Sequence, residues 1–166
     1  GLGYDLLNQI AESDSLRVLS SGPANAFYIL LNGESAQLKA SCKTLLKKIK
    51  KSDIIDNLIV DQIHPEVLPA FFAQAKPELQ TALGICECKT LSAAFQGAQL
   101  AAEAGAQIID LRPAQGTQPA HFFFTSADTP LAKKAMTKVQ AKLKSKKTLV
   151  RGTLISPTTQ ALQKYF

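Results

Sequence analysis

The pattern of apolar and polar residues predicts the same order of elements twice along the chain. Each half begins with a helical pattern, at residues 2–13 and 91–106, followed by a short apolar strand, LRVL or QIIDL. Both strands run into loops that contain Gly and Pro, which supply the dihedral angles of a defined turn. A strand rich in β-forming residues then follows in each half, at 27–33 and at 121–127.

An amphipathic helix comes next in each half, after a polar turn. Glu34 and Ser35 open the first helix, and Asp128, Thr129 and Pro130 open the second, with Asp128 as the expected N-cap. Apolar residues recur at the spacing that gives each helix one buried stripe. The stripe positions are 38, 42, 45, 46 and 49 in the first helix and 132, 136, 139 and 143 in the second. Both helices are therefore expected to pack on a sheet.

The two halves close in the same way. A further strand is predicted at 53–60 and at 148–155, and a short helical segment at 64–72 and at 156–166. The second half alone has one more strand ahead of its first helix, ALGICECK at 82–89. Each half thus reads helix, strand, loop, strand, helix, strand and short helix.

The repeated order corresponds to a sequence offset of 94 residues. At this offset residues 3–72 lie over 97–166 without a gap, although only nine positions are identical. The polar, Pro-containing stretch at 73–80 is typical of a linker. The repeat therefore divides the chain into a first domain at 1–72, this linker, and a second domain at 81–166.

These elements predict an α+β fold of two tandem ferredoxin-like domains, each a four-stranded antiparallel sheet with helices on one side. The strand at 82–89 opens the second domain. Its counterpart would precede Gly1, so the first domain lacks its first strand. We expect either that this sequence begins late, or that something else covers the sheet edge left exposed.

Composition narrows the class of protein. The chain has 166 residues, of which 46% are hydrophobic and 19% charged, as in ordinary globular domains. No apolar run approaches the ~18 residues of a transmembrane helix, and no signal-peptide pattern is visible. Three cysteines without framework spacing indicate free thiols in a reducing compartment. We therefore expect a cytoplasmic protein without a membrane partner.

The net charge of +6 comes largely from two lysine clusters, at 43–51 and 141–147. Helix C-termini favour cations, so the clusters are interpreted as solvated helix ends. A basic nucleic-acid binder is the other interpretation, but no recognition motif accompanies the lysines. Nucleic acid is not expected as a partner, and salt-sensitive binding to generic DNA or RNA would be required to argue otherwise.

Candidate chemical groups are few and do not form a constellation. Cys86 and Cys88 lie two apart on a predicted strand, which puts both thiols on one face. Structural zinc usually needs four ligands, so core packing is the preferred interpretation. His64 and His121 have no nucleophile or carboxylate at a readable spacing, and no Gly-rich nucleotide motif is present. The sequence therefore predicts no catalytic residue, no metal, no cofactor and no enzyme activity.

Residues 82–109, ALGICECKTLSAAFQGAQLAAEAGAQII, resemble the start of a bacterial microcompartment shell domain. In that family an apolar strand with a Glu-x-Lys-like end runs into an Ala-rich helix. The tandem arrangement, with IHPEVLPAFF closing the first copy, is similar to tandem-domain shell proteins, which form trimers that mimic hexamers. The SSG of the first loop resembles the non-permuted propanediol-utilisation type.

The resemblance implies a structural function. Three chains would form a six-sided tile, which packs edge to edge with other shell proteins to enclose enzymes in the cytoplasm. The loop between the second and third strands of each domain would line an axial pore for small polar metabolites. The implied pore residues are Ser20, Ser21, Gly22 and Pro23 in the first copy, and Ala114, Gln115, Gly116 and Thr117 in the second.

Two further implications concern single residues. Lys89 aligns with a family lysine at the tile edge, where it would pack against its copy on the next tile. Some tandem shell proteins hold an iron–sulfur cluster through a cysteine in the pore loop. Here those loops carry Ser, Gln and Gly instead, so no cluster is expected.

One alternative of a different class remains open from the sequence. A duplicated ferredoxin-like α+β unit also suits a small-molecule-binding or regulatory module, with its ligand held between the copies. A saturable ligand that binds a monomer or dimer would favour this module over a shell tile.

Overall fold

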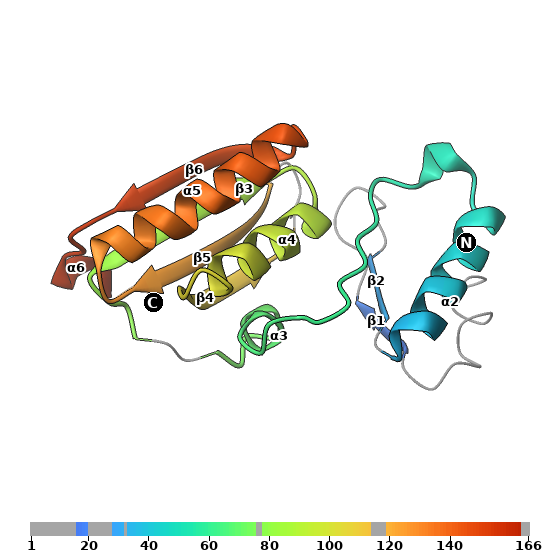
Figure 1. Ribbon diagram of the computed structural model, residues 1–166, viewed down its shortest axis with the longest axis horizontal. Coiled ribbons are helices and arrows are strands. Elements are labelled where there is room, and N and C mark those ends of the chain that lie inside the picture. Colours follow the sequence, from blue (N-terminus) through green and yellow to red (C-terminus); the bar gives the residue numbers. More distant parts are fainter. Residues whose placement is uncertain (1–15, 20–27, 32, 76–77, 114–118, 164–166) are drawn as a thin grey trace. The chain divides into compact units, whose positions relative to one another are not determined.

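The computed structural model describes residues 16–19, 28–31, 33–75, 78–113 and 119–163 (Figure 1). The chain divides into two compact units, Gly1–Asp61 and Gln62–Phe166. This division falls earlier than the end of the predicted first copy at residue 72. The repeat in the sequence and the compact units therefore divide the chain at different places.

The second unit contains a four-stranded sheet of β3 (Ala82–Cys88), β4 (Gln107–Arg112), β5 (Ala120–Ser126) and β6 (Leu149–Ile155). The strand order is β4-β5-β3-β6, and every neighbouring pair is antiparallel. Two helices, α4 (Leu91–Ala102) and α5 (Thr129–Ser145), lie on one face of this sheet (Figure 1). The expected α+β fold, with an antiparallel sheet and helices on one side, is confirmed for this unit.

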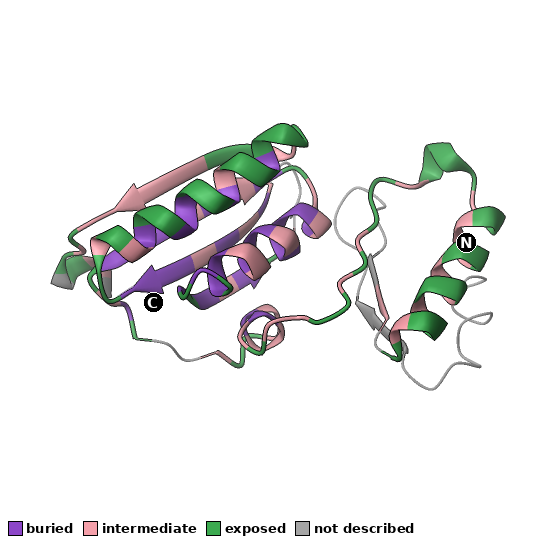
Figure 2. Ribbon diagram, in the orientation of Figure 1, coloured by how far each residue is buried: buried purple, intermediate pink, exposed green. Residues whose placement is uncertain are grey.

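The core of the second unit lies between the sheet and these helices, whose sheet-facing sides are buried in Figure 2. The predicted stripe on α5 is confirmed, since Ala132, Met136, Val139 and Leu143 are all buried. Asp128 caps this helix as predicted, because its Oδ1 accepts a hydrogen bond of 2.6 Å from Leu131 N. Sequence periodicity and capping chemistry thus gave this helix correctly.

The face of the sheet opposite α4 and α5 carries a smaller apolar cluster. Leu79, Leu83 and Ile109 are its buried members, and Leu162 of the short helix α6 (Gln160–Gln163) packs against them. Thr158 holds this closing segment in place, because its N donates to Thr81 O (2.9 Å) and its Oγ1 to Gln80 O (2.6 Å). The C-terminal segment therefore covers part of the second face.

A further short helix, α3 (Val67–Phe71), belongs to the second compact unit. It packs beside β4 and α4, and Val67 and Ala70 are buried there. The segment that closes the first copy in the repeat thus contributes to the core of the second unit.

The first unit contains β1 (Leu16–Leu19), β2 (Tyr28–Leu31), α2 (Ser35–Lys48) and the 3₁₀ turn η2 (Lys51–Asp53). The two strands pair antiparallel, and Glu34 caps α2 by accepting from Ala36 N and Gln37 N at 3.2 Å each. The helix predicted at 2–13 lies outside the described residues.

Two predictions for the first unit are wrong. Residues 54–60 form no strand, although 53–60 was expected to be one. The α2 stripe is only half-buried, and no residue of this helix is buried. In the second unit the strand that lies over residues 55–60, β6, pairs with β3, whereas none of the described residues pairs with 54–60. Among the described residues, no helix is long and apolar enough to cross a bilayer.

Candidate functional site

The predicted pore residues Ser20, Ser21, Gly22 and Pro23, and Ala114, Gln115, Gly116 and Thr117, lie outside the described residues. The strands that flank them are described. Leu19 pairs with Tyr28 across β1 and β2, and Arg112 pairs with His121 across β4 and β5. Both predicted pore loops therefore connect two neighbouring antiparallel strands, in equivalent places in the two copies.

Lys89 is exposed at the junction between β3 and α4. Its backbone N donates to Thr148 O at 2.9 Å, just ahead of β6. The next residue, Thr90, caps α4 by accepting from Ala93 N at 3.1 Å. The sequence ECKT thus ends a strand and starts a helix, and it presents the lysine side chain to solvent.

The register of the sheet brings Lys89 close to one flank of the second pore loop. Cys88 pairs with Ala120, the first residue of β5, and the loop at 114–118 ends just before that strand. Neighbouring strands lie about 5 Å apart, so Lys89 and Pro119 are at adjacent strand ends. Lys89 and the end of the second predicted pore loop therefore lie at the same end of the sheet.

The lysine cluster at 141–147 surrounds the C-terminal end of α5 at the same end of the sheet. Lys142, Lys144, Lys146 and Lys147 are all exposed. Two of them, Lys142 and Lys144, lie in the last turn of the helix, where cations interact favourably with the helix dipole. The interpretation of this cluster as a solvated helix end agrees with its place in the structure.

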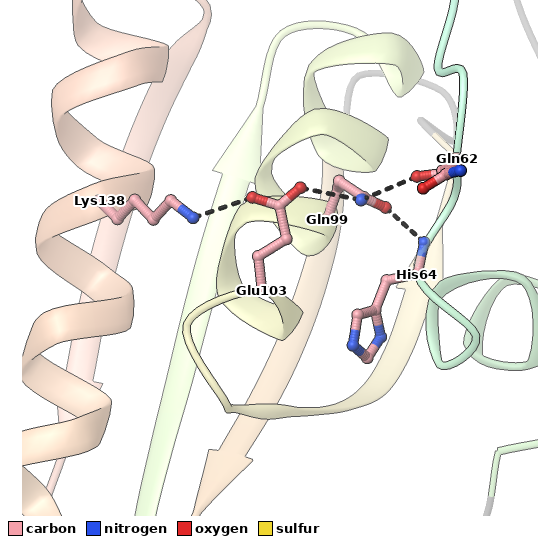
Figure 3. A network of polar contacts seen from close by, with 5 residues as sticks. All are labelled: Gln62, His64, Gln99, Glu103 and Lys138. Atoms are coloured by element: carbon pink, nitrogen blue, oxygen red, sulfur yellow. Dashed lines mark hydrogen bonds and ion pairs between the residues drawn. The ribbon is translucent and has the colours of Figure 1, made fainter.

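A polar network that the sequence analysis missed is centred on Gln99 of α4 (Figure 3). Its amide Nε2 donates to Gln62 O at 3.2 Å and to Glu103 Oε1 at 2.9 Å. Its Oε1 accepts from His64 N at 2.7 Å. One side chain therefore fixes the incoming segment 62–64 to the helix.

Glu103 extends this network to the neighbouring helix. Its Oε2 forms an ion pair of 2.8 Å with Lys138 Nζ of α5. The pKa of Glu103 lies below its usual value, because the hydrogen bond from Lys138, followed by that from Gln99, stabilises the carboxylate. Both partners of the ion pair are partly exposed, and the pair links the surfaces of α4 and α5.

Glu66 attaches the same segment to the edge of the sheet. Its Oε2 accepts from Ile108 N of the edge strand β4 at 3.0 Å. The backbone N–H of an edge strand is thereby satisfied by a side chain instead of a further strand. The partners in these contacts are 35 and 42 residues apart in sequence, and no local pattern signals such a pairing.

Cys86 and Cys88 are fully buried on the helix-facing side of β3, which confirms their interpretation as core residues. Burial raises the pKa of both thiols, that of Cys88 to about 12 with a further contribution from the charge of Glu87. Cys86 Sγ contacts Met136 Sδ at 3.8 Å. Within the described ranges, no group of three or more His, Cys, Asp or Glu is placed to hold a metal ion.

His64 and His121 lie in different elements and contact different partners. His64 lies in the network segment, with its Nδ1 3.4 Å from Glu66 N. His121 is the second residue of β5, and its ring lies edge-on against that of Phe123, with ring centroids 5.2 Å apart. These contacts give both histidines structural roles.

Comparisons with known proteins show a likeness in fold. No protein-family model and no curated protein sequence matches the chain. A solved structure of a microcompartments protein from Desulfitobacterium hafniense DCB is similar, with a TM-score of 0.82 and 20% sequence identity. The match covers 98% of this chain and 91% of that chain. At this identity the likeness shows the fold: the chain has the fold of a microcompartment protein.

Proposed function

We propose that the protein is a structural component of a bacterial microcompartment shell and not an enzyme. The observation that carries the proposal is the fold likeness to a microcompartments protein over 98% of the chain. The repeat with an offset of 94 residues supports it independently, because a duplicated domain can occupy alternate positions of a six-sided tile. The protein would then work in the cytoplasm, within the shell.

The assembly we propose is a trimer of the non-permuted tandem type, which resembles the propanediol-utilisation shell proteins. Three copies would place six domains around one axis. The predicted pore loops, Ser20–Pro23 and Ala114–Thr117, would line an opening for small polar metabolites. Gly22 and Gly116 suit this position, since glycine lets loops approach closely. Hydroxyl and amide groups beside them offer hydrogen bonds to molecules in transit.

Light scattering after size exclusion tests the assembly directly. We expect a species of three chains at micromolar concentration. A clean monomer would contradict the proposal, and saturable binding of a small metabolite by that monomer would favour a regulatory module instead.

Cysteine cross-linking tests the pore within the same trimer. In a Cys42→Ser background, Gly116→Cys should form inter-chain disulfides in dilute trimers, because three copies of this position would meet near the axis. Ser145→Cys, at the exposed end of α5, is the matched control. Trimers that never cross-link through position 116 would exclude the proposed pore while leaving the trimer intact.

A further inference from the structure

We propose that three sulfur atoms in the core of the second unit form a binding site for a soft metal ion, Cu(I). The sulfurs belong to Cys86 and Cys88 on β3 and to Met136 on α5. The inference rests on the side chains of this unit and does not depend on the proposed shell function.

Two of the three sulfurs are already in contact. The Cys86 thiol donates to the Met136 thioether, and Sγ and Sδ are 3.8 Å apart. Two sulfurs bound to one ion at about 2.3 Å each lie about 3.8–4.0 Å apart when the geometry is tetrahedral or trigonal. The observed separation is therefore the one that a shared ion needs, so binding requires little movement of β3 or α5.

Cys88 supplies the third sulfur. Side chains alternate along a strand, so Cys86 and Cys88 share the face of β3 that is turned toward the helices, and both are fully buried there. Residues two apart in a strand have their Cα atoms about 6.6 Å from each other. The common χ1 rotamers in strands lean side chains along the strand in either direction, so the two thiols can converge on one ion.

The neighbouring positions in the sheet are small. Cys86 pairs with Gly152 on β6. Cys88 pairs with Ala120 on β5. A Cβ on Gly152 would lie 3.2 Å from Met136 Sδ, so a side chain at this position would press on the thioether. The glycine therefore leaves space beside the sulfurs.

The site lies one strand in from the edge of the sheet. β6 is the edge strand, and α5 packs on it. Gly152 of β6 and Gln140 of α5 are both half-buried, and a Cβ on this glycine would lie 3.1 Å from Gln140 Nε2. Met136 keeps an exposed fraction of 6%. An ion can therefore reach the sulfurs past Gln140, between α5 and the edge strand.

The donor atoms select the kind of ion. Thiolate and thioether sulfurs are soft ligands, which favour Cu(I) over hard cations such as Mg²⁺ or Ca²⁺. On binding, Cu(I) takes the place of the Cys86 thiol proton, which leaves to water, while Cys88 coordinates as a neutral thiol. One thiolate balances the charge of Cu(I), so the buried site stays uncharged and avoids the cost of burying an ion alone.

Competition for Cu(I) in the absence of oxygen tests the site. The full chain carries Cys42→Ser, which removes the half-exposed thiol, and it is titrated into Cu(I) held by the coloured chelator bicinchoninate. We expect each chain to withdraw one ion. Cys86→Ala, Cys88→Ala and Met136→Leu should each weaken binding at least about tenfold, because each removes a ligand. Val139→Ala is the matched control, since it loosens the buried face of the same helix without removing a sulfur.

Each outcome supports or contradicts the site. A chain that withdraws no Cu(I) would overturn it, and so would unchanged binding in any one of the three ligand variants. Equal weakening by Val139→Ala would also overturn it, because a loosened core would then explain the loss. X-ray absorption at the copper edge of the loaded Cys42→Ser chain gives a second answer if a variant fails to fold. A shell of three sulfurs at about 2.3 Å supports the site, and a shell of nitrogen or oxygen contradicts it.

Discussion

At the scale of single residues, burial separates the three cysteines into two kinds. Cys86 and Cys88 are fully buried on β3, whereas Cys42 on α2 is half-exposed. We expect a thiol reagent at pH 8 to modify Cys42 rapidly and the other two only after unfolding, because the thiolate is the reactive form and burial suppresses it. Counting modified thiols against time measures this. Cys42→Ser should remove the fast phase, and three equal rates would contradict the assignment.

The buried thiols of Cys86 and Cys88 make the free energy of unfolding depend on pH in the alkaline range. The pKa of Cys88 is about 12 in the folded chain against an ordinary value of 9.0, so the unfolded chain releases this proton first. The contribution of the buried thiol is therefore complete below pH 9 and is lost as the pH rises toward 12. A Cys86→Ala/Cys88→Ala variant should show a flatter decline of melting temperature above pH 9. Parallel declines in both proteins would contradict the burial of the thiols.

Replacing Gln99 should weaken the attachment of segment 62–64 to α4 in particular. Gln99→Leu removes three hydrogen bonds and leaves His64 N without its partner. We expect the free energy of unfolding to fall by about 1–3 kcal/mol. Amides of 62–66 should also exchange faster. Gln96→Leu on the same helix is the control, and equal effects of the two variants would mean that the network does not anchor this segment.

At the scale of elements, close packing of β3 against β5 depends on a glycine. Gly84→Ala should destabilise the second unit by about 1–3 kcal/mol, because the new methyl group meets the Phe124 ring, even though alanine restricts the unfolded chain more than glycine. Urea unfolding measures the loss. Adding Phe124→Leu should make the double variant more stable than the sum of the single changes predicts, and strict additivity would show that the ring is not the obstacle.

The sequence predicted those elements whose pattern is local. Helical spacing gave α2 and α5, and the Asp128 cap and the strands of the second unit were found within a residue or two. The strand expected at 53–60 failed because apolar residues form a strand only when another strand pairs with them. The Gln99 network escaped notice because single polar residues far apart in sequence carry no periodic signal. What depended on a partner distant in sequence was therefore not predictable from local pattern.

At the scale of the whole molecule, the residues that lie together at one end of the sheet restrict how the second unit can be placed in a tile. The strand ends there carry Lys89, Pro119 and the start of β6, and the second predicted pore loop leads into β5. Because the distance between Lys89 and Pro119 is fixed within the unit, orientation cannot move one to the axis and the other to the rim, so the two predicted positions compete. The orientation, and not the fold of one unit, decides whether Lys89 can meet its copy on another tile.

Lys89→Cys distinguishes these orientations in a Cys42→Ser background. The tile-edge prediction requires that position 89 of one trimer meets position 89 of the next. We therefore expect inter-chain disulfides only after trimers assemble into layers, and none in dilute trimers. Gly116→Cys is the matched control, because a pore residue should cross-link in dilute trimers already. Disulfides through position 89 in dilute trimers would place this lysine beside the axis with Pro119, since a rim residue cannot reach its copy within one tile.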